Sequence, residues 1–327
     1  MGASSFLVLN NFPLLSNTNG YYEDVVKALF TADDFVEEVR HNNTRNQRYW
    51  GDQFINDTET YVFRGLRQTA RVLKQRLEIY GSSLNKVKSD YKSAKTYIKV
   101  QYPFGHPIRN LTFDEFIEQI NAIVYDTQVN SQIEDGYLRE TLNEIDLMLP
   151  GMPLSSYLYC CLLAIEDDDV VEYDLSEVIN AGYVLVEEFQ QIPIEKIIVL
   201  TEGKTDTEFI SGALKLLYPH LINYYHFIDF NDDLKPEASA SALSRLVISF
   251  CAAKIKHPII AIFDNDTTGC LEHDRIPKGS LPSNIRILKL PDIALAKRYP
   301  TLGPTGLKAF NINGLACGIE LILGWTF

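Results

Sequence analysis

The sequence predicts an α/β protein in which a mostly helical region precedes a parallel β-sheet. Two runs of apolar, mostly β-branched residues, 197–200 and 259–263, have the composition of strands buried on both faces of a parallel sheet. Around them, strand-type and helical patterns alternate, as in β-α-β units. The chain has 327 residues, enough for two domains. We place the boundary near Gln191, which gives domains at residues 1–191 and 192–327.

The N-terminal region begins with short elements. Residues 5–10 predict a strand, and residues 22–30 and 33–40 predict helices. Residues 42–46 are rich in asparagine and predict a turn or loop. The run Tyr61-Val62-Phe63 consists of strand-forming residues and predicts another strand.

Two basic helices are expected next. Residues 66–80 place an apolar stripe on one helix face, and Gly81 ends that helix. The stripe consists of Leu66, Ala70, Leu73 and Leu77. Residues 83–100 predict the second helix, so the pair should form a helical hairpin.

Two capping boxes indicate further helices. Thr112-Phe113-Asp114-Glu115 opens a helix to about residue 125, and Asp174-Leu175-Ser176-Glu177 opens one to about residue 190. Between them, residues 136–147 and the apolar residues 155–165 are predicted to be helical, with a turn at residues 150–153.

The C-terminal region alternates between the strand and helix patterns. The expected order is strand 196–200, helix 205–217, strand 225–230, helix 238–256 and strand 257–263. Residues 285–290 add a fourth strand, and residues 315–323 a last helical segment.

Composition excludes several classes of protein. No stretch reaches 18 consecutive apolar residues, so we expect no membrane-spanning helix and no membrane partner. The N-terminus lacks the basic start of a secretory signal, and the five cysteines form no C-x-x-C pair. We therefore expect a cytoplasmic protein with reduced thiols and no structural zinc.

Charge is distributed unevenly along the chain, whose net charge is −13. Residues 61–110 contain eleven basic and two acidic residues, whereas residues 111–190 contain eighteen acidic residues and one basic residue. One interpretation is a basic surface that holds nucleic-acid phosphates despite the acidic total. The other is two solvated faces that pair with each other. The candidate nucleic-acid-binding residues are Arg64, Arg67, Arg71, Lys74, Lys88, Lys92 and Lys204.

Acidic residues follow two of the predicted parallel strands. Glu202 lies in a turn after the strand at residues 197–200, and Asp264 and Asp266 follow the strand at residues 259–263. The carboxyl ends of parallel strands are where open α/β sheets place their sites. Clustered carboxylates repel one another, and a hard divalent cation such as Mg²⁺ relieves that repulsion. The pattern favours metal-assisted phosphoryl chemistry.

Two further carboxylates are candidate metal ligands. Asp206 lies in the first turn of the helix after Glu202, and Glu320 lies on the last helical segment. A carboxylate in a first helical turn is also favoured without a metal. Lys204, between the first two acids, would either contact phosphate or remain solvated in its turn.

These residues resemble the Toprim domain, a Rossmann-like fold shared by topoisomerases, bacterial primases and OLD-family nucleases. The resemblance covers about residues 192–323 and rests on Thr201-Glu202-Gly203-Lys204-Thr205-Asp206 and Asp264-Asn265-Asp266. The first run and the later Gly318-Ile319-Glu320 are most similar to the OLD-type nuclease branch. Residues 61–65 and 75–81 resemble the helical HEPN/Toprim-associated region.

The resemblance implies a Mg²⁺- or Mn²⁺-dependent nuclease that hydrolyses DNA or RNA phosphodiester bonds, of a kind associated with bacterial defence against phage. Glu202, Asp264 and Asp266 would be the catalytic residues, with Glu202 acting as a metal ligand or as an acid/base. The implied metal ligands are Glu202, Asp206, Asp264, Asp266 and Glu320.

The chain lacks parts that related proteins carry. Ile198 stands where a P-loop would need glycine, so an ATPase would have to be a partner or activator. No histidine follows an arginine at the spacing of RNA-cleaving HEPN domains, so the N-terminal region is expected to bind or assemble. The alternative function is a non-catalytic nucleic-acid-binding or assembly protein with a degenerate Toprim fold. The sequence is compatible with a homo-oligomer.

Overall fold

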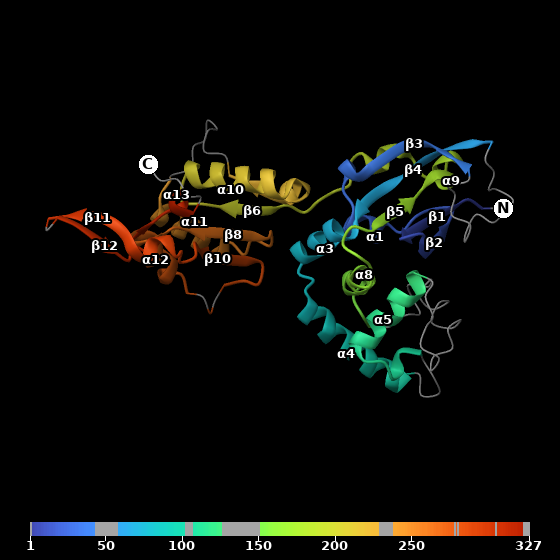
Figure 1. The fold of residues 1–327 in the computed structure, drawn as a ribbon, viewed down its shortest axis with the longest axis horizontal. Helices are drawn as coiled ribbons and strands as arrows, with labels where there is room; N and C mark the ends of the chain where they lie inside the picture. The colour runs from blue at the N-terminus through green and yellow to red at the C-terminus, as the bar shows by residue number, and fades with distance from the viewer. Residues whose placement is uncertain are drawn as a thin grey trace. The chain divides into compact units, whose positions relative to one another are not determined.

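The computed structural model describes residues 2–42, 58–101, 107–125, 151–228, 238–277, 279, 281–304 and 306–322. The chain divides into two compact units, Met1–Ile194 and Glu195–Phe327 (Figure 1). Each unit has its own sheet and its own hydrophobic core. Among the residues described, no helix combines the length and the apolar character needed to cross a membrane.

The N-terminal unit contains a five-stranded antiparallel sheet in the order β2-β1-β5-β4-β3. The strands are β1 (Ser4–Leu9), β2 (Phe12–Thr18), β3 (Phe35–His41), β4 (Thr60–Thr69) and β5 (Val170–Asp174). A two-residue loop joins β1 to β2, and its residues Asn10 and Asn11 have φ angles of 43° and 66°. Two successive positive φ angles are typical of a type I′ hairpin turn, which asparagine tolerates.

Helices share one hydrophobic core with this sheet. They are α1 (Glu23–Leu29), α3 (Ala70–Ile79), α4 (Leu84–Gln101), α5 (Phe113–Val124), α8 (Leu154–Leu163) and α9 (Ser176–Asn180), with 3₁₀ helices at Ala32–Asp34, Pro107–Arg109 and Val186–Phe189. Leu7, Leu66 and Tyr173 are aligned across β1, β4 and β5 and are fully buried. They join Leu73 of α3 and Leu158 of α8 in one core.

The helical hairpin and the first capping box are confirmed. α3 and α4 flank Gly81, which has a φ of +92°. At the start of α5, the Thr112 hydroxyl accepts a hydrogen bond from the Glu115 backbone N–H, and the Glu115 carboxylate accepts one from the Thr112 backbone N–H. The predicted helix at residues 136–147 and most of the predicted loop at 42–46 lie outside the described residues.

Several N-terminal predictions were wrong. Residues 33–40, predicted to be helical, form one 3₁₀ turn and then β3, while β2 was not predicted at all. α3 begins at Ala70 rather than at residue 66, because β4 continues to Thr69. The predicted box at Asp174 does not form, because Asp174 Oδ1 accepts a hydrogen bond from the Ser176 backbone N–H and the Glu177 carboxylate accepts one from the Ser4 backbone N–H. The helix there, α9, has only five residues before the chain turns at Gly182, whose φ is +74°. The described part of the unit therefore combines its helices with a five-stranded antiparallel sheet, of which only the strands at residues 5–10 and 61–63 were predicted.

The C-terminal unit contains the predicted parallel sheet. Its order is β10-β8-β6-β7, and its strands are β6 (Ile197–Leu200), β7 (Tyr225–Phe227), β8 (Ile259–Phe263) and β10 (Ile285–Lys289). The connecting helices are α10 (Lys204–Leu217), α11 (Ala240–Ala252) and α12 (Thr267–Arg275). Leu243 and Val247 of α11 pack on Leu200, Ile259 and Phe263 of the sheet.

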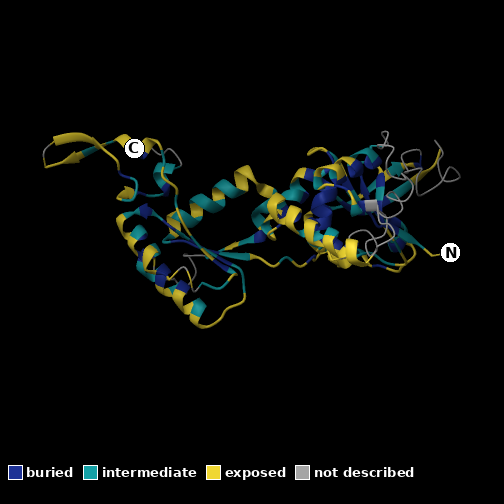
Figure 2. Ribbon diagram, turned by 90° about the horizontal axis from the view of Figure 1, so that it is seen from below, coloured by how far each residue is buried: buried dark blue, intermediate teal, exposed yellow. Residues whose placement is uncertain are grey.

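Smaller elements complete this unit. They are a 3₁₀ helix at Pro219–Tyr224, the short pair β9 (Asn265–Asp266) and β13 (Ala316–Cys317), a 3₁₀ helix at Leu295–Arg298, the hairpin of β11 (Tyr299–Gly303) and β12 (Gly306–Phe310), and α13 (Ile319–Ile322). The hairpin is drawn mostly as exposed in Figure 2. The predicted last helix at 315–323 is wrong in its first half, because Ala316 and Cys317 pair with β9.

Candidate metal centre

The strand order of the parallel sheet creates a switch point between β6 and β8. β7 follows β6 in sequence and lies on one side of it, whereas β8 lies on the other side. Ligands of open α/β sheets bind outside the carboxyl ends of strands at such a point. Glu202 follows the end of β6 by two residues, and Asp264 follows β8 directly. Two of the predicted site residues therefore meet where this topology places a ligand.

Glu202 and Asp264 are in direct contact. The Glu202 Oε1 accepts a hydrogen bond from the Asp264 backbone N–H, with 2.8 Å between the heavy atoms. Gly269 closes over this contact: a Cβ there would lie 2.5 Å from the Asp264 carbonyl oxygen and 2.7 Å from Glu202 Oε1. A side chain at residue 269 would force the two acidic residues apart, so the sequence supplies glycine at the close approach.

Asp206 and Asp266 are both held at helix N-termini. Asp266 caps α12, and its Oδ1 accepts a 2.6 Å hydrogen bond from the Gly269 backbone N–H. In the first turn of α10, Asp206 Oδ2 accepts a 3.0 Å hydrogen bond from the Gly203 backbone N–H. These bonds orient the two carboxylates and satisfy backbone donors that lack helical partners.

Glu320 enters the cluster from the far end of the sequence. It lies on α13, directly after β13, which pairs with β9 beside Asp266. A Cβ on Gly318 would lie 2.7 Å from Glu320 Oε2 and 3.8 Å from Asp264 Oδ2. The carboxylates of Glu320 and Asp264 therefore approach each other over a glycine.

The electrostatics tie the five carboxylates together. Burial and, to a smaller extent, the charges of Asp206, Glu202, Asp266 and Glu320 together raise the pKa of Asp264 to about 7. Burial also raises the pKa of Glu202, assisted by Asp266 and Asp206, and the pKa of Asp206, assisted by Glu320. Within the described ranges, none of the five forms an ion pair with a basic side chain. The cluster carries uncompensated negative charge.

The donor set fits a hard divalent cation, although the side chains do not enclose one. All five candidate ligands are carboxylates, and none is a thiolate or an imidazole. Carboxylate oxygens suit Mg²⁺ or Mn²⁺. In the part of the chain that the structure describes, no three His, Cys, Asp or Glu side chains converge closely enough to ligate one ion. Glu202 bonds to the Asp264 backbone, and Asp264 and Glu320 flank Gly318, so these carboxylates are neighbours without converging on one point.

Sequence reasoning missed two residues beside this cluster. Asn265, between the two aspartates, is fully buried, and its amide Nδ2 donates a 2.8 Å hydrogen bond to Asp292 Oδ1. Asp292 and Asp264 both act on the pKa of Cys317, which burial raises in the first place. Asp292 follows β10 at the same edge of the sheet, so the rule that selected Glu202 and Asp264 would also have selected it.

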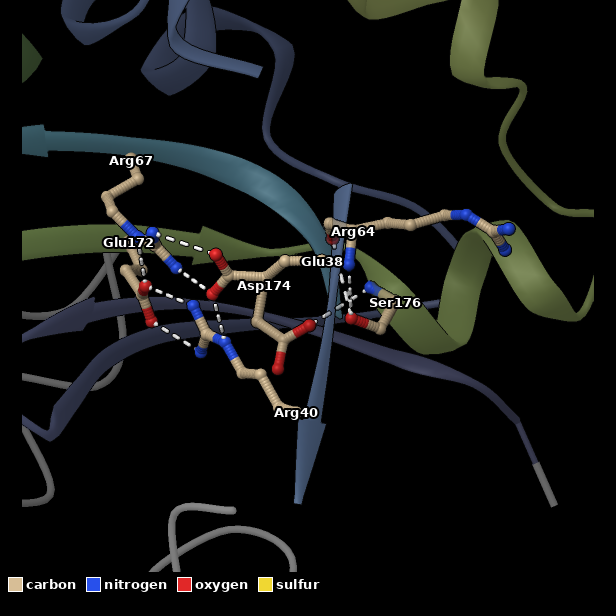
Figure 3. Close-up of polar contacts among 7 residues, drawn as sticks. All are labelled: Glu38, Arg40, Arg64, Arg67, Glu172, Asp174 and Ser176. Atoms are coloured by element: carbon tan, nitrogen blue, oxygen red, sulfur yellow. Dashed lines mark hydrogen bonds and ion pairs between the residues drawn. The ribbon is translucent and has the colours of Figure 1, made fainter. Parts of the chain in front are cut away.

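Arg67 of β4 lies in an ion-pair network on the N-terminal sheet (Figure 3). Arg67 Nε donates to Glu172 Oε1 at 2.7 Å, and Arg67 also pairs with Glu38. Arg40 pairs with both of these glutamates and lies over the Phe63 ring at 3.5 Å. Hydrogen bonds from Arg67 and then Arg40 lower the pKa of Glu38 to about 2. The two arginines are therefore balanced by two glutamates.

The other predicted basic residues also have acidic neighbours, with one exception. Arg64 pairs with Glu37, Arg71 with Asp167 and Asp168, Lys74 with Asp167, Lys88 with Asp114, and Lys204 with Glu208. Lys92 lies on the exposed side of α4. The seven residues are divided between the two units: six belong to the N-terminal unit, whereas Lys204 belongs to the C-terminal unit beside the carboxylates.

Comparison with known proteins identifies the N-terminal unit. Residues 1–195 match a family model described as HEPN/Toprim N-terminal domain 1. The match covers more than half of the chain and ends where the N-terminal unit ends, so the carboxylate cluster lies outside it. The sequence has no match among curated proteins or among solved structures.

Proposed function

The chain belongs to the HEPN/Toprim N-terminal domain 1 family, and from that premise we propose that it is a Mg²⁺- or Mn²⁺-dependent nuclease of DNA or RNA. Membership indicates a nuclease-related role and nucleic acid as the substrate class. The observation that carries the proposal is the cluster of five carboxylates at the switch point of the parallel sheet, in which the pKa of Asp264 rises to about 7. The proposed catalytic unit is the Toprim-like C-terminal unit, residues 192–327 as predicted from sequence.

Glu202, Asp264 and Asp266 would hold the metal, with Asp206 and Glu320 as further ligands. A bound divalent cation supplies positive charge that stabilises the charge developing on the phosphoryl oxygens. Glu202 is oriented by the Asp264 backbone N–H and half-buried, which raises its pKa and suits it for proton transfer as well. Asp206 and Asp266 are fixed by helix N-termini, so little reorganisation is needed at those two positions.

The test is cleavage of single-stranded and duplex DNA and RNA with Mg²⁺, Mn²⁺ or EDTA. We expect metal-dependent cleavage that is lost in Asp264→Asn/Asp266→Asn by at least about 100-fold, because the ligands carry the charge that binds the ion. Asp274→Asn, which changes an exposed aspartate at the other end of α12, is the control and should retain activity. Cleavage that persists in EDTA or in the double variant would refute the proposal.

One observation favours a second function, a non-catalytic nucleic-acid-binding or assembly protein. No three carboxylates in the described ranges converge on one point, as an established metal site would require. If this alternative holds, the protein binds nucleic acid but does not cleave it with Mg²⁺, with Mn²⁺ or in EDTA. The same panel distinguishes the two, since binding is read in EDTA and cleavage in Mg²⁺ or Mn²⁺.

We propose bacterial anti-phage defence in the cytoplasm as the biological setting, with a partner ATPase or activator and a homo-oligomer as the proposed assemblies. The support is the resemblance to OLD-type nucleases and the family membership of residues 1–195. Cells expressing the chain should reduce phage plaque numbers, and cells expressing Asp264→Asn/Asp266→Asn should not. Equal protection by both proteins would separate defence from the carboxylate cluster.

A further inference from the structure

α10 presents two different faces, and its polar face lines a cavity of about 350 Å³. The polar residues Lys204, Thr207, Ser211 and Lys215 recur at spacings of three and four, which places them on one side of the helix. The apolar residues, among them Phe209 and Leu214, line a separate apolar cavity against the sheet. The polar face is therefore a continuous strip along the whole helix, and no residue of α10 is buried.

Positive charge is concentrated along this strip. Three lysines line the cavity: Lys204 and Lys215 from α10, and Lys196 from the segment before β6. Among the described residues of the lining, Glu208 is the one that is acidic, and its pair with Lys204 is an exposed 3.5 Å contact. Such exposed pairs contribute little, typically about 0–1 kcal/mol, and yield readily to a competing anion. A local excess of cations in a chain of net charge −13 favours a polyanionic ligand.

The opposite wall of the cavity supplies aromatic rings. Tyr225 and Phe227 lie on the same side of β7, the edge strand of the parallel sheet, and both line the cavity. Both side chains are only partly buried. Lysines along a groove together with aromatic rings on which bases stack are the combination that single-stranded nucleic-acid-binding proteins use.

The position and length of the strip agree with this ligand. Lys204 is two residues from Glu202, so one end of the strip lies at the carboxylate cluster. From Lys204 to Lys215 the helix rises by about 16 Å, at roughly 1.5 Å per residue. That length spans on the order of five nucleotides stacked at about 3.4 Å. Lys196 precedes β6, whose other end leads to Glu202, so it extends the positive charge away from the cluster.

We propose that this α10 groove, formed by Lys196, Lys204, Thr207, Ser211, Lys215, Tyr225 and Phe227, binds an unpaired nucleic-acid strand that leads to the carboxylate cluster. The lysines and hydroxyls contact phosphates, and the rings of Tyr225 and Phe227 stack on bases. In a duplex the bases are already stacked on one another and their faces are not available to these rings. The substrate class is therefore a nucleic acid with a single-stranded segment. The inference rests on the proposed nuclease function for what happens at the end of the strand.

The test measures binding of the full chain in EDTA, so that it does not depend on cleavage. Fluorescein-labelled 12-nucleotide single strands of DNA and RNA, and the matching duplexes, are titrated and followed by fluorescence anisotropy. We expect the single strands to bind at least about fivefold more tightly than the duplexes, because only they offer free base faces. Lys196→Glu/Lys215→Glu should weaken single-strand binding by about 10-fold or more and reduce the salt slope by about 0.7 for each phosphate that the protein no longer neutralises.

A matched control separates the groove from net charge. Lys297→Glu/Lys308→Glu makes the same charge change at two exposed lysines of the same unit and should alter affinity less than about twofold. Tyr225→Leu should weaken single-strand binding by about 5–10-fold and leave duplex binding unchanged, since stacking contributes about 1–3 kcal/mol per base. Circular dichroism and thermal melts confirm that each variant is folded.

Equal losses in the groove and control variants, or equal affinity for single strands and duplexes, would refute the groove. The proposed nuclease function fails by a different result, namely no metal-dependent cleavage in any condition. Single-strand binding that depends on Lys196 and Lys215 in a protein that cuts nothing would support the groove and remove the nuclease. Metal-dependent cleavage, together with unchanged single-strand binding in Lys196→Glu/Lys215→Glu, would support the nuclease and refute the groove.

Discussion

Residue 269 fixes how closely the acidic residues can approach. A Cβ at Gly269 would meet the Asp264 carbonyl oxygen at 2.5 Å and Glu202 Oε1 at 2.7 Å, and the first of these is a backbone atom that cannot rotate away. Gly212, in the middle of α10, has open space where a Cβ would stand, with no neighbouring heavy atom within 4 Å. The two glycines therefore have different reasons for being glycine, and the same substitution should act on them in opposite directions.

Gly269→Ala is expected to lower the free energy of unfolding by about 1–3 kcal/mol, the usual cost of forcing an extra carbon into a packed site. Gly212→Ala should raise it by about 0.5–1 kcal/mol, because alanine loses less backbone entropy in a helix than glycine does. Urea unfolding of both variants measures the difference. If Gly269→Ala is as stable as the wild type, residue 269 does not constrain Glu202 and Asp264.

Asp264 is the residue whose charge is least compatible with the cluster. Burial and four neighbouring carboxylates raise its pKa to about 7, so at pH 8 it is ionised against their repulsion. Without divalent metal, Asp264→Asn should raise the melting temperature at pH 8 by about 2–8 °C, the shift that roughly 1 kcal/mol produces. Removing metal from the wild type and the variant with EDTA, followed by thermal melts, measures it.

Added Mg²⁺ or Mn²⁺ should make the wild type melt at a higher temperature than Asp264→Asn, the reverse of the order without metal. A cation that binds the folded wild type stabilises it in proportion to the logarithm of its concentration, and Asp264→Asn loses a ligand charge and gains less. Glu195→Gln removes a charge from an exposed glutamate in the same unit and is the control. A variant that is less stable than the wild type in EDTA, yet gains as much from Mg²⁺, would show that Asp264 is not part of a metal centre.

At the scale of single elements, β3 shows how cross-strand charge overrides local pattern. Glu38 of β3 is held by Arg67 of β4, and Arg40 of β3 by Glu172 of β5 (Figure 3). Cross-strand pairs are the unit of sheet stabilisation, and the pair of Arg40 with Glu172 joins residues 132 apart in sequence. The sequence 33–40 contains no signal for a partner at that distance, which explains why a helix was predicted there.

The Glu38 network should contribute a pH dependence to stability. The pKa of the Glu38 carboxyl is lowered from 4.5 to about 2 in the folded protein, so the unfolded state binds the proton more tightly. The stabilisation is therefore present above pH 4.5 and is lost as the pH falls toward 2. Glu38→Gln should flatten the decline in unfolding free energy between these pH values, measured by urea unfolding. Glu118→Gln, an exposed residue of α5, should keep the wild-type slope.

Other elements were predictable where a local signal determines them. The parallel strands at 197–200 and 259–263 are continuous apolar runs, and α5 has a complete capping box, so both appear as predicted. The missed β2 had a signal of its own, the pair Asn10 and Asn11, which adopts a type I′ turn. The box predicted at residue 174 is absent because the Glu177 carboxylate bonds to the Ser4 backbone N–H of β1, a partner that the local sequence does not reveal.

At the scale of the whole chain, the carboxylate cluster was predictable and its surroundings were not. Acids at the carboxyl ends of parallel strands follow from topology, so Glu202 and Asp264 were found, and Asp292 could have been. The α10 groove could not be found in the same way, because Lys196, Lys215 and Tyr225 meet only after α10 packs beside β7. Spacing along one helix predicts a face but does not predict what lies opposite it.

Part of the uneven charge of the N-terminal unit is paired within the unit. Arg71 and Lys74 of the basic segment pair with Asp167 and Asp168 of the acidic segment, and Arg67 pairs with Glu172. This pairing is the second of the two interpretations of the charge distribution. The more exposed of these pairs are each expected to contribute only about 0–1 kcal/mol, so their effect is best measured as a coupling.

Arg71→Glu/Lys74→Glu should lower the free energy of unfolding by about 1 kcal/mol, because three attractive pairs become repulsive. Adding Asp167→Lys/Asp168→Lys should restore most of it, and the double-mutant cycle from urea unfolding gives the coupling. Single-strand affinity in EDTA should change no more than it does in Lys297→Glu/Lys308→Glu. A different result is that Arg71→Glu/Lys74→Glu weakens single-strand binding about 10-fold and that adding Asp167→Lys/Asp168→Lys does not restore stability. The basic segment would then be a phosphate-binding surface whose ion pairs open for nucleic acid, and the α10 groove would not act alone.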